Sequence, residues 1–357
     1  ERHRGLVEQA VVAERSGFTS VHLGEHHFCD YILSAPPIVL AAISERTSTL
    51  RLSTGVTLGA NIDPVRLAED YATVDLLSGG RVEPVLGRGT FFPHTFRAFG
   101  QDPALAKPVF AEHVELLVKL WTEVNVQWSG AHHVPLDGVT TQPRPLQAPR
   151  PSMWIGAGTS PESIELAARL GLWLMLPTVF GTPELFRPMV DLYIRRWEEH
   201  GRDPADRRIG CCAHAWIAPD ETTARREWEP RYRAYVEWVN ELFRVSSGLT
   251  DGQGLGAFDF EERLRTIAIC GTPAQAADYH FRADTFTVVR NGSTLFQERG
   301  RRLRPFSLWV NRRGERRTAW VGRSSGEPVQ FSLTFSPPQG WSGIACTSPA
   351  LSNAGLP

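Results

Sequence analysis

Residues 20–28 read Ser-Val-His-Leu-Gly-Glu-His-His-Phe, a short apolar run that stops at a glycine and leads directly into three ionisable side chains. The run Val21–Leu23 is typical of a buried strand. Ionisable groups are costly to bury without a partner or water, so Glu25, His26 and His27 predict a reactive face at the end of this strand. The alternative is a solvated loop with incidental histidines, because histidine has several roles at intermediate burial.

Strands and helices alternate along the chain on either side of this stretch. Apolar runs predict strands at Val21–Leu23, Arg51–Val56, Val82–Leu86, Met153–Gly156, Leu172–Leu176 and Ile209–Ile217. Helical spacing predicts helices at 1–16, from Pro36, at 64–78, 110–121, between the fourth and fifth strands, and at 182–200. Alternation at this spacing indicates parallel βαβ units. Six or more such units favour a closed barrel over an open doubly wound sheet, and a Rossmann sheet is disfavoured because no GxGxxG follows the first strand. In a barrel, active sites form at the carboxyl ends of the strands.

Two segments interrupt the alternation. Residues 125–145 combine short β-like pieces with prolines and are predicted to leave the barrel. Residues 221–245 are helical in pattern, and we expect Pro230 to interrupt that helix. The aromatic residues of 228–243 indicate either an apolar substrate or helix packing. The glycine-rich stretch 246–256 predicts either a lid over the site or a surface insertion.

Composition places the chain among soluble globular proteins, with 42% hydrophobic and 22% charged residues among 357. No apolar run approaches the ~20 residues of a membrane helix, and the start does not resemble a signal peptide. The five cysteines are scattered and lack CxxC spacing, which favours a reducing, cytoplasmic setting without a metal site. Adjacent Cys211 and Cys212 are expected to pack in a strand, since a disulfide between neighbours is strained.

A second stretch of interest is 156–163, Gly-Ala-Gly-Thr-Ser-Pro-Glu-Ser, which follows a strand and begins a helix. Ser160 is placed to cap the helix and Pro161 to occupy its first turn. Free backbone N–H groups at such a terminus attract anions, and Thr159, Ser160 and Ser163 add hydroxyl donors beside the glycine Gly158. An ordinary capped helix without a bound anion would have the same sequence pattern.

Gly87-Arg88-Gly89 ends another strand. Its glycines allow close approach of a ligand, and Arg88 can grip a phosphate with two hydrogen bonds. A surface arginine in a turn is the alternative. Two phosphate-competent strand ends on one barrel face together predict a cofactor with a terminal phosphate.

These motifs resemble the luciferase-like flavin monooxygenase family, in the family's order over about residues 5–280. The matching segments are Gly24–Phe28, Arg46–Thr47, Leu52–Val56, Pro64–Asp70, Asp75–Val82, Gly87–Gly89, Phe96–Gly100, Gln142–Gln147, Trp154–Gly156 and Gly271–Pro273. The resemblance implies a (β/α)₈ barrel that binds reduced FMN supplied by a separate flavin reductase. Oxygen would add to the flavin to give a peroxyflavin that oxygenates a small substrate, apolar or aldehyde-like.

The resemblance also implies roles for individual residues. His26 falls at the family's catalytic histidine, and we expect an imidazole that titrates near neutrality. Glu25 either orients a neighbouring imidazole such as His27 or is a structural carboxylate. The FMN phosphate would be held by Arg88 with Gly89 and by Gly158, Thr159, Ser160 and Ser163. His94 stands where some members have an acidic residue, and no role is carried to it.

Two other functions stay open. One is a deazaflavin-dependent oxidoreductase on the same barrel, and the other is a non-catalytic flavin-binding or partner subunit. A homodimer or heterodimer is implied by the resemblance alone, and no membrane or nucleic-acid partner is expected.

The carboxyl-terminal part differs in kind from the rest. Residues 286–357 contain ten Arg, no Lys and three Glu, a net charge of +7, whereas the remainder carries −8. We expect a barrel domain at 1–280 with an insertion at about 220–260, followed by an atypical, incidental tail at 281–357 in which Thr285–Val289 and Thr294–Gln297 form a hairpin. Relative to the family, the chain is expected to lack the first strand and to end in a replaced or frame-shifted last βα unit.

Overall fold

The structure is a computed structural model. It describes residues 2–296, except 30–32, 90–92, 182, 248–254, 267, 274, 276–279, 283–286 and 291–292, together with residues 332–333. Most of the predicted lid and tail therefore lie outside the described residues.

Parallel strands form the centre of the molecule. They are β1 (Ser20–Leu23), β2 (Arg51–Thr54), β3 (Thr57–Leu58), β4 (Val85–Gly87), β7 (Trp154–Gly156), β8 (Trp173–Leu176), β9 (Ile209–Ile217) and β10 (Ala268–Gly271). β1 pairs with β2, and the second run follows the order β3, β4, β7, β8, β9 and β10. A single parallel bridge between Leu52 and Val82 joins the two runs. This is the parallel strand order expected of the barrel.

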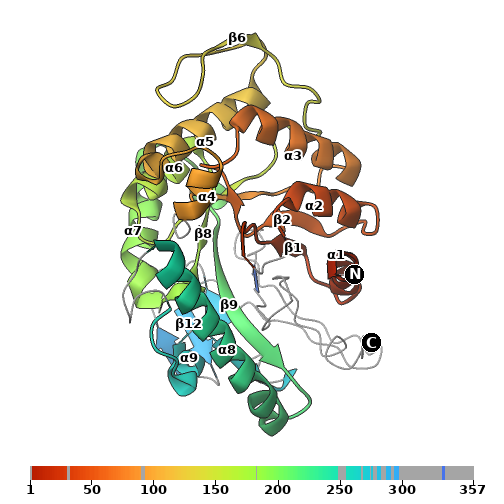
Figure 1. Ribbon diagram of the computed structural model, residues 1–357, viewed down its shortest axis with the longest axis vertical. Coiled ribbons are helices and arrows are strands. Elements are labelled where there is room, and N and C mark those ends of the chain that lie inside the picture. Colours follow the sequence, from red (N-terminus) through yellow and green to blue (C-terminus); the bar gives the residue numbers. More distant parts are fainter. Residues whose placement is uncertain are drawn as a thin grey trace.

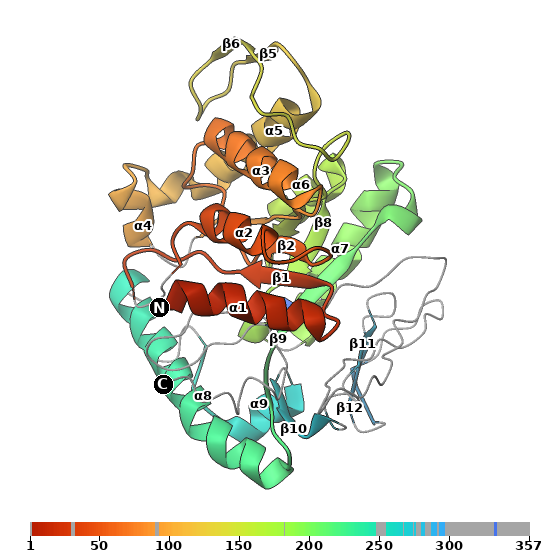
Figure 2. The same ribbon diagram turned by 90° about the vertical axis from the view of Figure 1, so that its right-hand side faces the viewer.

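Helices cover the outer side of these strands (Figure 1). They are α1 (Arg2–Arg15), α2 (Pro36–Ser44), α3 (Pro64–Ser78), α4 (Pro93–Ala98), α5 (Ala106–Thr122), α6 (Pro161–Leu170), α7 (Pro183–Glu199), α8 (Glu221–Ser247) and α9 (Phe260–Thr266). α1, α2 and α3 lie side by side on one flank (Figure 2). The main hydrophobic core lies between the strands and these helices.

The barrel is not closed within the residues that the structure describes. β1 and β10 stand at the two ends of the strand order and are not paired with each other. The short strand β14 (Ser332–Leu333) pairs in parallel with Cys212 and Ala213 of β9 and also contacts β1. The expectation of a closed barrel is corrected accordingly, while the α/β barrel-type fold is confirmed.

Glycines keep the strands close around bulky interior side chains. A methyl group added at Gly87 would come within 2.5 Å of Val56, and one at Gly156 within 2.8 Å of the same side chain. Val56 in turn packs with Val85, Trp154 and Met175. Since close-packed interiors tolerate little added volume, these strand positions require glycine.

Buried polar side chains join the helices to the loops between strands. The buried Asp75 carboxylate on α3 accepts the backbone N–H groups of Leu146 and Gln147 at 2.8 and 2.9 Å, and the Gln147 side-chain amide at 2.7 Å. The Arg81 guanidinium donates to the carbonyls of Ser44, Thr47, Leu50 and Ser78 and to the Thr47 hydroxyl. Each bond links segments that are distant in sequence or caps a helix end, so together they fix the loops on this flank.

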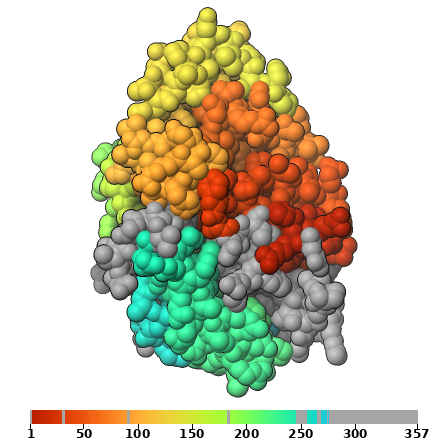
Figure 3. Space-filling model, viewed as in Figure 1, coloured from red at the N-terminus to blue at the C-terminus, as the bar shows by residue number. Residues whose placement is uncertain are grey.

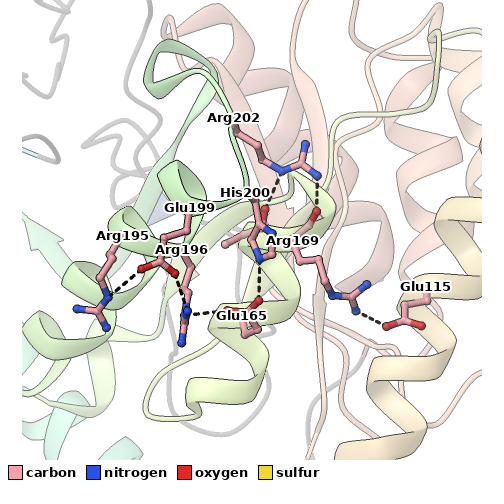
Figure 4. A network of polar contacts seen from close by, with 9 residues as sticks. Glu115, Glu165, Arg169, Arg195, Arg196, Glu199, His200 and Arg202 are labelled. Atoms are coloured by element: carbon pink, nitrogen blue, oxygen red, sulfur yellow. Dashed lines mark hydrogen bonds and ion pairs between the residues drawn. The ribbon is translucent and has the colours of Figure 1, made fainter.

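Charged groups connect α5, α6 and α7 on the opposite flank (Figure 4). Glu165 of α6 pairs with His200 at 2.7 Å and with Arg196 at 3.1 Å, and Arg169 pairs with Glu115 of α5. Arg202 donates to the last carbonyls of α6, at Ala168 and Arg169. These side chains are partly exposed, and exposed pairs contribute only ~0–1 kcal/mol each.

The excursion at 125–145 is an antiparallel hairpin of β5 (Val126–Trp128) and β6 (Leu136–Val139), at the far end of the molecule in Figure 3. The Glu112 carboxylate of α5 anchors it by accepting three consecutive backbone N–H groups, those of residues 131–133, each at 2.9 Å. These hydrogen bonds hold the pKa of Glu112 below its usual value although burial opposes the shift.

α8 is continuous, so the predicted interruption at Pro230 is wrong. The aromatic residues of 228–243 form a second core with α9 and β10, in which Trp228 stacks on Tyr232 with ring centroids 4.5 Å apart. Stacking and burial along this face hold the helix together across the proline, whose missing backbone hydrogen bond is a local cost. Helix packing, not a substrate, therefore accounts for the aromatic residues.

Other expectations are confirmed in detail. β1 and β9 occur as predicted, and α3 runs from Pro64 to Ser78 with Gly79 left-handed at its end (φ 67°). Cys211 and Cys212 are free cysteines within β9, as expected for strand packing. β11 (His280–Arg282), β12 (Thr287–Arg290) and β13 (Ser293–Phe296) form an antiparallel sheet that contains the predicted hairpin. Among the described helices, none has the length and apolar character needed to span a membrane.

We predict that Asp75→Asn lowers the free energy of unfolding by about 1–3 kcal/mol, because the amide cannot accept all three donors and leaves a buried one unsatisfied. Chemical denaturation followed by fluorescence measures the change. Asp70→Asn is the matched control, since Asp70 lies on the same helix in an exposed pair with Arg66, and it should cost no more than about 1 kcal/mol. Equal losses in the two variants would contradict the role given to Asp75.

Candidate active site

The predicted site residues lie at the carboxyl ends of parallel strands. Glu25, His26 and His27 follow β1, Arg88 and Gly89 follow β4, and Gly158 to Ser163 lead from β7 into α6. Hydrogen bonds join the first two of these strand ends. The turn after β3 connects them, with the Gly59 N–H donating to Gly87 O at 2.9 Å and the Leu58 N–H donating to Glu25.

Glu25 is a buried carboxylate with two fixed donors. Its Oε1 accepts from Nε2 of His27 at 2.9 Å, and its Oε2 accepts the Leu58 N–H at 2.9 Å. The carboxylate thereby favours a proton on Nε2 of His27 and orients that ring. Glu25 therefore combines the two roles expected for it. It orients the imidazole of His27, and as a structural carboxylate it joins β1 to β3.

An ordered chain of hydroxyls lies next to this carboxylate. Thr54 donates to Val85 O at 3.0 Å and accepts the Val85 N–H, so the Thr57 hydroxyl must donate to Thr54, at 3.1 Å. Tyr71 then donates to Thr57. Burial raises the pKa of Tyr71, the Thr57 hydroxyl opposes that shift, and the negative charge of Glu25 adds to it. Tyr71 is therefore a fixed neutral donor that ties α3 to the strands.

The two histidines nearest the strand are held neutral. His22 is buried, with Nδ1 3.4 Å from Thr54 O and Nε2 3.1 Å from the Ser20 hydroxyl, and burial lowers its pKa to about 4 although Thr54 O opposes the shift. His26 is partly accessible, and burial together with the charge of His27 lowers its pKa to about 4. The expectation that His26 titrates near neutrality is thus wrong. At pH 7 it is a neutral imidazole, able to accept a proton or a hydrogen bond.

Aromatic side chains cover the loop after β1. The ring of Phe99, just beyond α4, meets His27 edge-on with centroids 5.0 Å apart, and Phe28 contacts both Phe99 and His94. Phe28 has a φ of 58°, which is rare for a bulky residue. α4 therefore packs on the histidine loop, and His94 lies beside Phe28.

The anion-binding stretch has the predicted local geometry. Ser160 caps α6, with its Oγ 3.4 Å from the Ser163 N–H, and Pro161 occupies the first turn. The Ser163 hydroxyl donates to Ser160 Oγ at 3.3 Å, while Thr159 is exposed. Arg88 is half-buried, and burial lowers its pKa whereas the nearby Glu162 carboxylate opposes that shift. Arg88 and the start of α6 are therefore close enough to interact.

Sequence reasoning missed an amide pair at this edge. Nε2 of Gln101 donates to the carbonyl of Asn61 at 3.2 Å, so Oε1 of Gln101 must accept from Nδ2 of Asn61, at 3.0 Å. Oδ1 of Asn61 is buried without a hydrogen-bond partner among the described residues, and a Cβ at Gly89 would lie 3.2 Å from it. Gly89 also has a φ of 75°, so glycine is required there. No spacing signal links two amides 40 residues apart.

Comparisons with known proteins identify the family of the chain. A family model described as "Luciferase-like monooxygenase" matches residues 1–280. An uncharacterised protein of Sinorhizobium fredii is 37% identical over 163 residues, which is 45% of this chain and 47% of that protein. The oxygenase component of the flavin-dependent trigonelline monooxygenase of Acinetobacter baylyi is 25% identical over 250 residues, 68% of each chain. The chain thus spans about half of one of these relatives and two thirds of the other.

Solved structures show the same fold. The monooxygenase RslO1 of Streptomyces bottropensis superposes with a TM-score of 0.65 at 29% identity, covering 76% of this chain and 79% of that one. More distant structures, at 16–20% identity, include both an FMN complex and F420-dependent enzymes. The fold by itself therefore does not distinguish the two cofactors.

We predict that the fold loses stability as the pH falls from 7 to 5. The pKa of His22 is about 4 when folded and about 6.5 when unfolded, so the unfolded chain binds more protons within this window. The loss attributable to His22 is roughly 2 kcal/mol between these pH values. Urea denaturation at each pH measures it. His22→Asn keeps a donor near Thr54 O without titrating and should reduce the pH dependence; an unchanged dependence would contradict the assignment.

We also predict that Glu25→Gln destabilises the protein by about 1–3 kcal/mol, because Leu58 and His27 donate to different oxygens of the carboxylate and the amide keeps only one of these acceptors. Denaturation midpoints give the difference. Glu8→Gln, at an exposed pair with Arg46, serves as the control and should change stability by about 1 kcal/mol at most. The role of Glu25 would be refuted by a variant as stable as this control.

Proposed function

The chain belongs to the luciferase-like monooxygenase family, and we propose that it is the oxygenase of a two-component system that uses reduced FMN and O₂ on a small organic substrate. A separate flavin reductase supplies the reduced cofactor in this proposal. One observation carries it. The Glu25–His27 pair and neutral His26 lie on the same strand-end face as the half-buried Arg88 and the capped start of α6.

The residues at the anion end fit a phosphate. Arg88 is partly desolvated, and no carboxylate among the described residues lies within ion-pair distance of it. A desolvated cation gains most from an anionic partner, and guanidinium matches phosphate geometry. The hydroxyls of Ser160 and Ser163 lie at the start of α6 on the same side.

The residues at the histidine end fit a proton acceptor beside a reactive ring. Reduced flavin, when bound, supplies the electrons that activate O₂. His26 is neutral at pH 7 and can accept a proton or a hydrogen bond there. Glu25 orients His27, and the contact of His27 with Phe99 holds the loop against α4 and excludes water from one side. The substrate would meet His26 at this edge, in a pocket whose apolar or aldehyde-like specificity belongs to the proposal.

The relative from Acinetobacter supports the reductase, since it is described as an oxygenase component. A deazaflavin cofactor and a non-catalytic flavin-binding role are the competing functions. A homodimer or heterodimer remains part of the proposal.

We predict that His26→Ala leaves the dissociation constant for FMN within about threefold and lowers the rate of substrate oxygenation by roughly 10²–10⁴-fold. Anaerobic titration with reduced FMN gives binding, and product formation after mixing with O₂ gives turnover per bound flavin. His200→Ala, a surface histidine on α7's flank, should change neither quantity.

Three results would count against this function. Loss of FMN binding with unchanged turnover per bound flavin would show that His26 serves the cofactor site and not the proton transfer. Turnover with reduced deazaflavin but not FMN would favour the oxidoreductase. Tight FMN binding by the wild-type protein without any oxygenated product, over a panel of aldehydes and ketones, would favour the non-catalytic subunit.

A further inference from the structure

Glu162 occupies the donors that a phosphate would need. It is the second residue of α6, and its carboxylate accepts from the Ser160 hydroxyl at 2.7 Å and lies 3.3 Å from Nζ of Lys107. Its charge also acts on Arg88. The carboxylate thus binds Ser160 and acts on Arg88, two of the groups expected to hold an anion.

The hydroxyl protons of Ser160 and Ser163 both point toward that carboxylate. Ser163 Oγ donates to Ser160 Oγ, and Ser160 Oγ donates to Glu162. A hydroxyl has one proton to donate, so Ser160 cannot donate to a phosphate while it donates to Glu162. The Ser160 hydroxyl is consequently occupied by the carboxylate of Glu162, a group of the same chain.

The donors are fixed, whereas the carboxylate is exposed. Ser160 and Ser163 are buried, at 6% and 5% exposure, while the Glu162 side chain is 65% exposed. The Ser160 hydroxyl, the N–H of Glu162 itself and Lys107 hold the pKa of Glu162 at about 2, so it is negative at any physiological pH. An exposed side chain can turn into water while the donors stay in place.

We propose that Glu162 is an internal competitor for the phosphate of the flavin cofactor, a role that rests on the proposed function. The carboxylate holds Ser160 and Lys107 in the free protein and must leave them, or lie beside the phosphate as a like charge, when the cofactor binds. Either event weakens binding, since apparent affinity falls with the fraction of protein in the competent arrangement. An acid in the first turn of a helix ordinarily only stabilises the helix, and that simpler role makes a different prediction.

The competitor role and the helix-stabilising role of Glu162 predict different affinities for ligands with and without a phosphate. Glu162→Gln should tighten FMN binding by roughly tenfold, because the like charge is removed and an amide competes less well for Ser160. Riboflavin, which lacks the phosphate, should bind both proteins equally. Fluorescence quenching of each flavin by wild type and variant measures the dissociation constants, at 50 and 300 mM salt. The gain should shrink at the higher salt, where charges are screened.

Glu165→Gln is the matched control, since it removes one negative charge from the same helix on the side facing His200 and should leave FMN affinity unchanged. Ser160→Ala should weaken FMN binding whether or not Glu162 is present. Circular dichroism of each variant checks that α6 still forms, and Glu162→Ala provides a second test if the glutamine variant unfolds.

Equal FMN affinity in wild type and Glu162→Gln would overturn the competitor role and leave the proposed function intact. An equal gain for riboflavin would do the same, because the effect would not depend on phosphate. If neither protein bound FMN at millimolar concentration, the proposed function itself would fail and the inference with it.

Discussion

The buried carboxylate of Glu25 is the constraint on which the reactive face depends. It accepts one N–H from β3 and one from the ring of His27, so the end of the first described strand, the next strand and the histidine loop share one acceptor. A buried carboxylate without such donors would cost several kcal/mol, which is why the loop cannot move independently of β3. The hydroxyls of Tyr71, Thr57 and Thr54 continue this ordered set toward β4.

Packing inside the strands sets how closely those ends can meet. Val56 fills the interior between β4 and β7, and only glycine at 87 and 156 leaves room for it. Because the strands are held this closely, Arg88 and the start of α6 lie near enough for Glu162 to affect the pKa of Arg88. A larger residue at either glycine would push the phosphate-competent ends apart. The packing of the interior therefore sets the distance between the residues that would hold the ligand.

The two ends of the site treat charge in opposite ways. At the histidine end, burial favours neutral imidazoles at His22 and His26, and Glu25 brings a negative charge that its two donors stabilise. At the anion end, positive groups are retained and are balanced by an exposed carboxylate that can move. Such a division suits a cofactor with an uncharged ring region and a charged tail, since each part would meet a matching environment.

The sequence by itself determined the order and type of the elements, the family, and the strand ends at which Glu25, His26, His27, Arg88 and Ser160 would lie. Those features are local, since hydrophobic period, a capping serine and a glycine stop act within a few residues.

Tertiary structure alone decided the rest. The continuity of α8 across Pro230 depends on aromatic packing against distant segments, and the pairing of Asn61 with Gln101 joins residues far apart in the chain. The low pKa of His26 follows from burial, which no spacing reveals. The contact of Glu162 with Ser160 is local, whereas its contact with Lys107 depends on how α5 packs beside α6.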